Sequence, residues 1–218
     1  MTATTAHADD LRDRTIGHVI TAPTAWMPDG ITTTAGVDRF GNWNVGGTLG
    51  YGIASIELAR DTEDDLKRAT FRIGARQDSW FAGQPAVAFG VRSTWGTEDA
   101  VADAFLVASR DLGPVRLHAG ASIADSAASP RKSFEQELRQ IRPLGGIEWT
   151  PGQYPRTTLM GDIVWAGEKT IPDPRFTTGV AVRYQAFRWG SVDFGVRYRD
   201  GQQVDEASFF ARINATTR

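Results

Sequence analysis

The chain has 218 residues and a formal net charge of -2, so no strong electrostatic field favours nucleic acid as a partner. It contains no cysteine, which excludes a disulfide framework and a cysteine-ligated zinc site. The mean hydropathy is -0.31, and no apolar run approaches the ~20 residues of a membrane-spanning helix. Glycine and tryptophan are abundant, with 23 and 7 residues, as is usual in β-barrels.

The first part of the chain is polar. We expect residues 1–14 to be flexible and residues 15–218 to form the folded domain. Ala6-His7-Ala8 resembles the small-x-small end of a cleaved signal peptide, so we expect a secretory leader that is removed or absent from the given sequence. The alternative is a native cytosolic start. Residues 15–22 predict either a short strand or an extended lead-in.

From residue 31 onward, apolar and polar residues alternate in segments of strand length. These segments span residues 31–40, 43–51, 53–60, 66–77, 86–94, 101–110, 115–123, 144–150, 157–166, 176–186, 192–199 and 205–214. Most are close to the ~9–11 residues that cross a bilayer as a tilted strand. The pattern therefore predicts an all-β fold, a single antiparallel transmembrane β-barrel of about 12 strands.

One long break interrupts the alternation between residues 125 and 142. Within it, residues 133–141 predict a short helix, because Ser133 and Gln136 form a capping box. Phe134, Leu138 and Ile141 lie on one face of that helix, and we expect this face to plug the lumen if the loop folds inward. Connections on the side of the termini are mostly short and those on the other side longer, as in outer-membrane barrels.

Charged side chains gather on the face of the strands that we assign to the barrel interior. The residues that we expect to contact an anionic solute are Arg72, Arg76, Arg92, Arg116, His118, Arg183, Asp193, Arg197 and Arg212, and Asp38, Glu57, Glu148, Asp162 and Arg199 share their face. In a dry core, each unpaired ion would cost several kcal/mol. The excess of arginine predicts a net positive lumen, which is either a paired network that fills the interior or a passage that binds or conducts solutes.

Two further residue types carry structural expectations. Tryptophans such as Trp26, Trp43 and Trp165 fall near strand ends, which favours interfacial girdles over ordinary packing at the ends of a sheet. Glycines on the inner face, among them Gly74 and Gly179, leave room inside the barrel and permit sharp coiling of the strands.

Catalytic patterns are poor. His118 and Ser122 share a face, but four residues along a strand separate them by ~13 Å, too far for a catalytic pair. No hydrolase, phosphate-binding or metal-ligand motif occurs. We therefore expect no enzyme activity, no catalytic residues, no metal and no cofactor.

Three passages carry a family resemblance. Residues 22–30 read APTAWMPDG, residues 85–97 read PAVAFGVRSTWGT, and residues 145–151 read GGIEWTP. They resemble motifs of the YjbH-like outer-membrane proteins from exopolysaccharide operons, although Ser93 stands where that family has aspartate. The resemblance implies an outer-membrane barrel associated with polysaccharide export or assembly, and it supplies no catalytic residues.

The resulting hypothesis is a barrel of the bacterial outer membrane that acts in exopolysaccharide secretion, as a conduit or as part of an exporter. Its expected partners are outer-membrane lipid, an anionic polysaccharide and other export components. One alternative is a small general porin or structural barrel without a polysaccharide role. A second is a soluble secreted β-sandwich that binds glycans.

Overall fold

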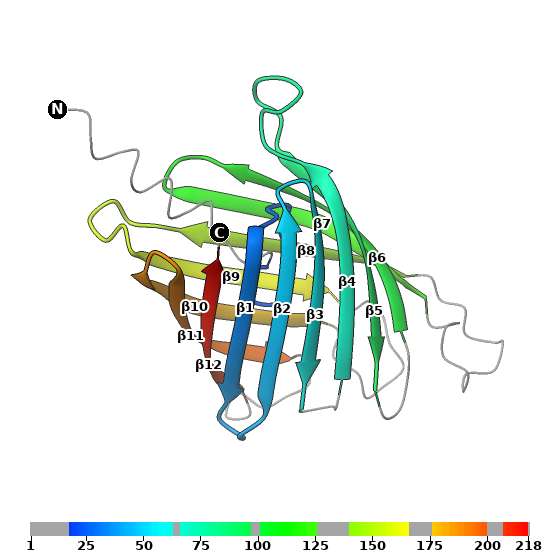
Figure 1. Cartoon of the computed structure of the whole chain (residues 1–218), viewed down its shortest axis with the longest axis vertical. Helices are drawn as coiled ribbons and strands as arrows, with labels where there is room; N and C mark the ends of the chain where they lie inside the picture. The colour runs from blue at the N-terminus through cyan, green and yellow to red at the C-terminus, as the bar shows by residue number, and fades with distance from the viewer. Residues whose placement is uncertain are drawn as a thin grey trace.

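The computed structural model describes residues 18–62, 66–96, 101–125, 140–165, 176–199 and 207–217. The strands are β1 (Asp29–Asp38), β2 (Trp43–Tyr51), β3 (Ala54–Asp61), β4 (Leu66–Ala75), β5 (Ala86–Trp95), β6 (Val101–Asp111), β7 (Val115–Asp125), β8 (Gln140–Trp149), β9 (Thr157–Trp165), β10 (Phe176–Phe187), β11 (Gly190–Arg199) and β12 (Ser208–Thr217). Each pairs antiparallel with its neighbours in sequence, and β1 also pairs with β12, which closes the sheet into a barrel (Figure 1). The predicted barrel of about twelve antiparallel strands is confirmed.

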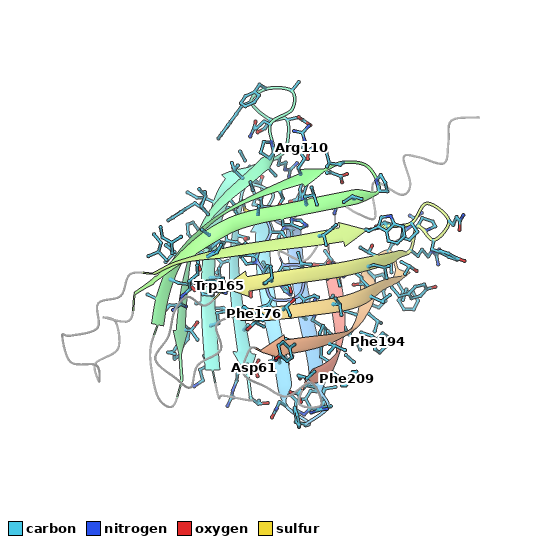
Figure 2. All side chains as sticks on the ribbon, turned by 180° about the vertical axis from the view of Figure 1, so that it is seen from behind. Asp61, Arg110, Trp165, Phe176, Phe194 and Phe209 are labelled. Carbon is cyan, nitrogen blue, oxygen red and sulfur yellow. The ribbon has the colours of Figure 1, made fainter. Side chains whose placement is uncertain are left out.

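The outer face of the barrel is apolar. Leu106 at the middle of β6 is 60% exposed, and Phe194 and Phe209 on β11 and β12 are 58% and 55% exposed (Figure 2). At the ends of β9 and β10, the rings of Trp165 and Phe176 stack with their centroids 6.1 Å apart (Figure 2). An apolar surface of this extent is stable against lipid rather than water. Among the described residues, no helix is long and apolar enough to cross a membrane.

The two ends of the barrel differ. At the end that carries Asp29 and the end of β12, residues 52–53, 112–114 and 188–189 are short connections, and residues 76–85 and 150–156 are longer ones. Residues 76–85 project well beyond the rim in Figure 1. At the other end, β1 and β2 are joined by residues 39–42, and the remaining connections contain the segments that the structure does not describe. We call these the turn end and the loop end.

The predicted helix is wrong at its C-terminal end. Residues 133–139, with Phe134 and Leu138, lie outside the described residues. Gln140 and Ile141, however, begin β8, four residues before the predicted start of that strand. Ile141 pairs with Ile123 of β7 and is 68% exposed on the outer face, so it is not part of a plug in the lumen.

The segment His18–Pro28 belongs to the described chain but not to the barrel wall. It turns back on itself through an isolated bridge between His18 and Pro23. Val19 and Ala22 are 0% exposed, because they pack against the inner faces of the strands. The predicted lead-in over residues 15–22 therefore continues, from residue 18 onward, into the interior of the barrel. Residues 1–17 lie outside the described residues.

Candidate functional site

Asp193 on β11 lies between two arginines on the neighbouring strands. The register places Arg183 of β10 and Arg212 of β12 opposite it, one on each side. Arg183 donates from Nε to Oδ1 at 2.8 Å and from Nη2 to Oδ2 at 3.0 Å. Arg212 donates from Nε and Nη2 to Oδ2 at 3.0 and 2.8 Å. Asp193 is 0% exposed, so the three side chains form a buried ionic cluster held by paired, charge-assisted hydrogen bonds.

A second ionic cluster lies across β3 and β4. Arg68 donates from Nη2 to Glu57 Oε1 at 2.9 Å, and Arg72 Nη2 lies 4.0 Å from Glu57 Oε2. Arg72 also donates from Nε to the hydroxyl of Ser55 at 3.1 Å. The side chain of Arg68 is 41% exposed and that of Arg72 only 1%, so Arg68 is the more accessible of the two cations.

Arg92 of β5 and Asp103 of β6 form a third pair. Arg92 donates from Nε to both carboxylate oxygens at 3.0 Å and from Nη2 to Oδ2 at 2.6 Å. Their side chains are 23% and 13% exposed, so water reaches both ions of this pair.

His118 of β7 connects a serine and a carboxylate on the two adjacent strands. Ser109 Oγ is 2.8 Å from His118 Nδ1, and His118 Nε2 is 3.3 Å from Glu148 Oε1. The order serine, histidine, carboxylate is that of hydrolase triads. Ser109 is only 1% exposed, and its hydroxyl accepts a hydrogen bond from the N–H of Ala25 at 2.8 Å. In this structure Ser109 therefore binds the N-terminal segment, and His118 and Glu148 lie behind it.

Arg116 also contacts the N-terminal segment. Its Nε donates to Asp111 Oδ2 at 2.8 Å, and its guanidinium lies over the ring of Trp26, 5.2 Å from the centroid. The ring of Trp26 packs inside the barrel against the apolar cluster that contains Ala22 and Phe105. The prediction that Trp26 belongs to an interfacial girdle is therefore wrong.

Asp162 of β9 holds the tip of the N-terminal segment. Its Oδ2 accepts hydrogen bonds from the N–H groups of Ile20, Thr21 and Ala22 at 3.0, 2.5 and 2.7 Å. From the opposite side, Arg212 donates from Nη2 to Val19 O at 3.2 Å. The carboxylate thus satisfies three successive donors of a segment that has no strand partner.

His18 at the beginning of the described segment is neutral. It lies outside the membrane-spanning strands, and burial, together with the nearby Arg212 guanidinium, lowers the pKa of its imidazole well below the ordinary value. Arg68, Arg72 and Arg183 lower the pKa further. The neutral ring accepts a hydrogen bond at Nε2 from Arg212 Nη1, at 2.8 Å.

Above the segment, towards the loop end, a cavity of about 160 Å³ remains open. Its charged lining residues are Arg68, Arg72, Arg92, Arg197, Arg212, Asp38, Glu57 and Asp61, and His18, Ile20 and Thr21 line it from the segment. Five arginines face three carboxylates, so the cavity lining is net positive. Asp103 and Asp193, the partners of Arg92 and Arg212, are not among the lining residues.

The predicted site residues fall into three groups. Arg72, Arg92, Arg197 and Arg212 line the cavity. Arg116, His118, Arg183 and Asp193 are buried in the interior, away from the cavity. Arg76 is not in the lumen: it follows β4 at the turn end, and its side chain is 61% exposed and 3.9 Å from Asp29.

Some site residues were missing from the prediction. The sequence prediction does not include Arg68, although the alternation places it on the same face as Arg72. The sequence does not indicate that Ser109 faces the interior, because β6 is apolar along most of its length and its residues do not alternate clearly. Arginines outnumber carboxylates in the cavity lining, whereas in the interior as a whole Glu148, Asp162 and Asp193 offset the arginines, so the net positive lumen stays a prediction.

No protein-family model matches the chain, and no curated relative matches it in sequence. Among solved structures, a NanC porin is similar with a TM-score of 0.62 and 10% identity, covering 87% of this chain and 100% of that one. A KdgM porin matches with a TM-score of 0.60 and 10% identity over 86% of this chain and 99% of that one. A KdgM porin has also been solved in complex with disordered oligogalacturonate.

Omp33 of Acinetobacter baumannii is a further structural neighbour, with a TM-score of 0.52 and 8% identity over 86% of this chain and 96% of that one. At these identities the likeness shows the fold alone. Together with the apolar exterior, this fold makes the chain an outer-membrane β-barrel with the same fold as these porins, in agreement with the predicted location. The resemblance to the YjbH-like family stays a prediction.

Proposed function

We propose that this barrel is a porin-like channel for small anionic solutes, with acidic oligosaccharides as its substrate class. The observation that carries the proposal is the cavity, in which five arginines face three carboxylates. A guanidinium group binds a carboxylate through two parallel hydrogen bonds, and a narrow cleft lined by one sign of charge concentrates the opposite ion. The complex of a KdgM porin with oligogalacturonate, an acidic saccharide, supports this class of solute.

A secretion role for a long exopolysaccharide, as the sequence resemblance implies, would use the same attraction between arginines and carboxylates. The segment His18–Pro28 argues for smaller solutes, because it fills the interior on the turn-end side of the cavity. A long polymer would have to thread past this segment. The export role and its partner proteins therefore remain a proposal that rests on the sequence motifs.

Solute uptake by proteoliposomes tests the channel directly. Vesicles that contain the protein are given either a galacturonate trisaccharide or a neutral galactose trisaccharide of the same length. We expect faster uptake of the acidic sugar, and we expect Arg68→Gln to reduce that preference because Arg68 is an accessible cation of the cavity. Arg76→Gln, which removes an arginine outside the lumen, is the matched control and should leave the preference unchanged. Equal uptake of the two sugars would refute the proposal.

A further inference from the structure

The interior of the barrel contains a site for a peptide backbone. Asp162 Oδ2 accepts hydrogen bonds from three consecutive N–H groups, and successive main-chain N–H groups of this kind form a concave binding surface for an anionic oxygen. Arg212 provides the complementary contacts, because it donates to the carbonyl oxygens of Val19 and Ile20 at 3.2 and 3.4 Å. Both the donors and the acceptors of the segment are thus bound by side chains of the wall.

The wall lacks side chains where the segment lies. A Cβ at Gly146 would stand 2.9 Å from Val19 Cγ2, and one at Gly179 would stand 3.1 Å from Ile20 Cδ1. A Cβ at Gly50 would meet the carbonyl oxygen of Pro28. Three different strands, β8, β10 and β2, therefore present glycine where the segment passes close to the wall. The shape of the interior matches its occupant.

The segment is nevertheless separable from the barrel. Every strand pair in the described residues involves only residues from Asp29 onward, so the barrel closes without the segment. Docking also leaves polar atoms unsatisfied: Thr21 Oγ1, Trp26 Nε1 and Asp162 Oδ1 are buried without a hydrogen-bond partner among the described residues. Such atoms lose water without gaining a partner, which lowers the free energy gained on docking.

We infer that His18–Pro28 is a releasable plug, and that the lumen surface around Asp162, Arg212 and Ser109 is an intramolecular peptide-binding site. In the docked state, the plug closes the route from the cavity to the turn end. When it leaves, the glycine-lined part of the lumen opens and the buried carboxylate of Asp162 becomes hydrated. The effect on solute passage rests on the proposed channel function, whereas the release of the segment does not.

Release is measured by the accessibility of a single thiol. The chain has no cysteine, and Ala22 is 0% exposed, so Ala22→Cys introduces one small, buried thiol at the tip of the plug. In folded protein in membranes, a membrane-impermeant maleimide should label it slowly. Asp162→Asn should raise the labelling rate about tenfold or more, the factor that corresponds to 1.4 kcal/mol of weaker docking.

Asp78→Asn is the matched control for this substitution. Asp78 lies on the turn between β4 and β5 with a φ of 57°, a backbone conformation that asparagine tolerates, and it does not touch the plug. It should leave the labelling rate unchanged, and a difference in gel migration between unheated and heated samples confirms that each variant is folded. Two results would overturn the inference. One is that Ala22→Cys alone is labelled as fast as an exposed thiol, and the other is that Asp162→Asn does not accelerate its labelling.

A disulfide tests whether the plug closes the lumen. In the double variant Val19→Cys, Gly146→Cys, the sulfur at residue 19 can take the position of Val19 Cγ2, 2.9 Å from the new Cβ, which is within disulfide reach. We expect the oxidised protein to be silent in planar bilayers and the reduced protein to conduct. Equal currents in both states, with the disulfide verified, would show that the segment is not a plug. If Asp162→Asn accelerates the labelling of Ala22→Cys but no variant conducts, the channel function is refuted and the peptide-binding site is still supported.

Discussion

Asp193 forms ion pairs with two buried arginines in the interior of the barrel. Its carboxylate is 0% exposed and accepts hydrogen bonds from both Arg183 and Arg212. Asp193→Asn would leave two buried guanidinium groups without their counter-ion, so we expect a loss of about 3–5 kcal/mol in the free energy of unfolding. The measurement is the urea midpoint of the barrel in lipid vesicles. Asp103→Asn is the control, since water reaches its partner Arg92; an equal loss there would contradict the role of burial.

The sequence predicts which face of the sheet each charged side chain occupies, but it does not predict which side chain is its ion-pair partner. Alternation placed Arg183, Asp193 and Arg212 on one face because side chains in a strand repeat every two residues. Their pairing depends on the register between strands, and this is fixed by long-range contacts that a single strand does not encode. For the same reason the hydrogen bond between Ser109 and His118, which joins β6 and β7, could not be read from the sequence.

At the scale of the element, the N-terminal plug depends on space left by glycine. Gly146→Ala places a methyl group 2.9 Å from Val19 Cγ2, so we expect docking of the plug to weaken by about 1–3 kcal/mol. Gly145→Ala is the matched control. Gly145 precedes Gly146 and faces the outside of the barrel, and the nearest atom to an added Cβ there is His118 O at 3.6 Å. The readout is the labelling rate of Ala22→Cys. The same rate in both variants would mean that Gly146 does not shape the plug site.

Docking of the plug should also depend on pH through His18. Burial lowers the pKa of His18 when docked, whereas a released histidine titrates near ~6.5. The released state then binds more protons as the pH falls below ~6.5, so docking is strongest above that value and weakens in acid. The check is the labelling rate of Ala22→Cys at each pH, relative to a free thiol. His18→Gln should remove the increase of the labelling rate in acid. If the labelling rate of this variant keeps the same pH dependence, His18 is not its source.

The position of the plug was beyond sequence analysis. The sequence predicts either a short strand or an extended lead-in over residues 15–22, and neither prediction places this segment inside the barrel. The inner-face glycines gave a partial signal, since Gly74 and Gly179 were expected to leave room in the lumen. What fills that room follows from the closed shape of the barrel, because Asp162 and Gly146 meet the segment from β9 and β8.

For the whole molecule, alternation predicts the strands, and the charged inner face, the unequal connections and the tryptophans near strand ends favour a barrel over a sandwich. The apolar exterior gives a depth-dependent prediction. Leu106→Arg, at the middle of β6, should cost about 2–4 kcal/mol of stability in lipid, whereas Ile141→Arg, at the start of β8, should cost about 0–1 kcal/mol. Urea unfolding in vesicles measures both. Equal costs would mean that these two positions do not differ in membrane depth.

We propose that the arginine-lined cavity is the entrance of an anion channel. The most direct measurement is the reversal potential of the protein in a planar bilayer under a gradient of potassium chloride. We predict that the reversal potential has the sign expected when chloride carries more of the current than potassium. Arg197→Gln in the cavity should move it towards zero, and Arg76→Gln at the turn end should not. A cation-selective current, or a potential that Arg197→Gln leaves unchanged, would show that the cavity arginines do not select for anions.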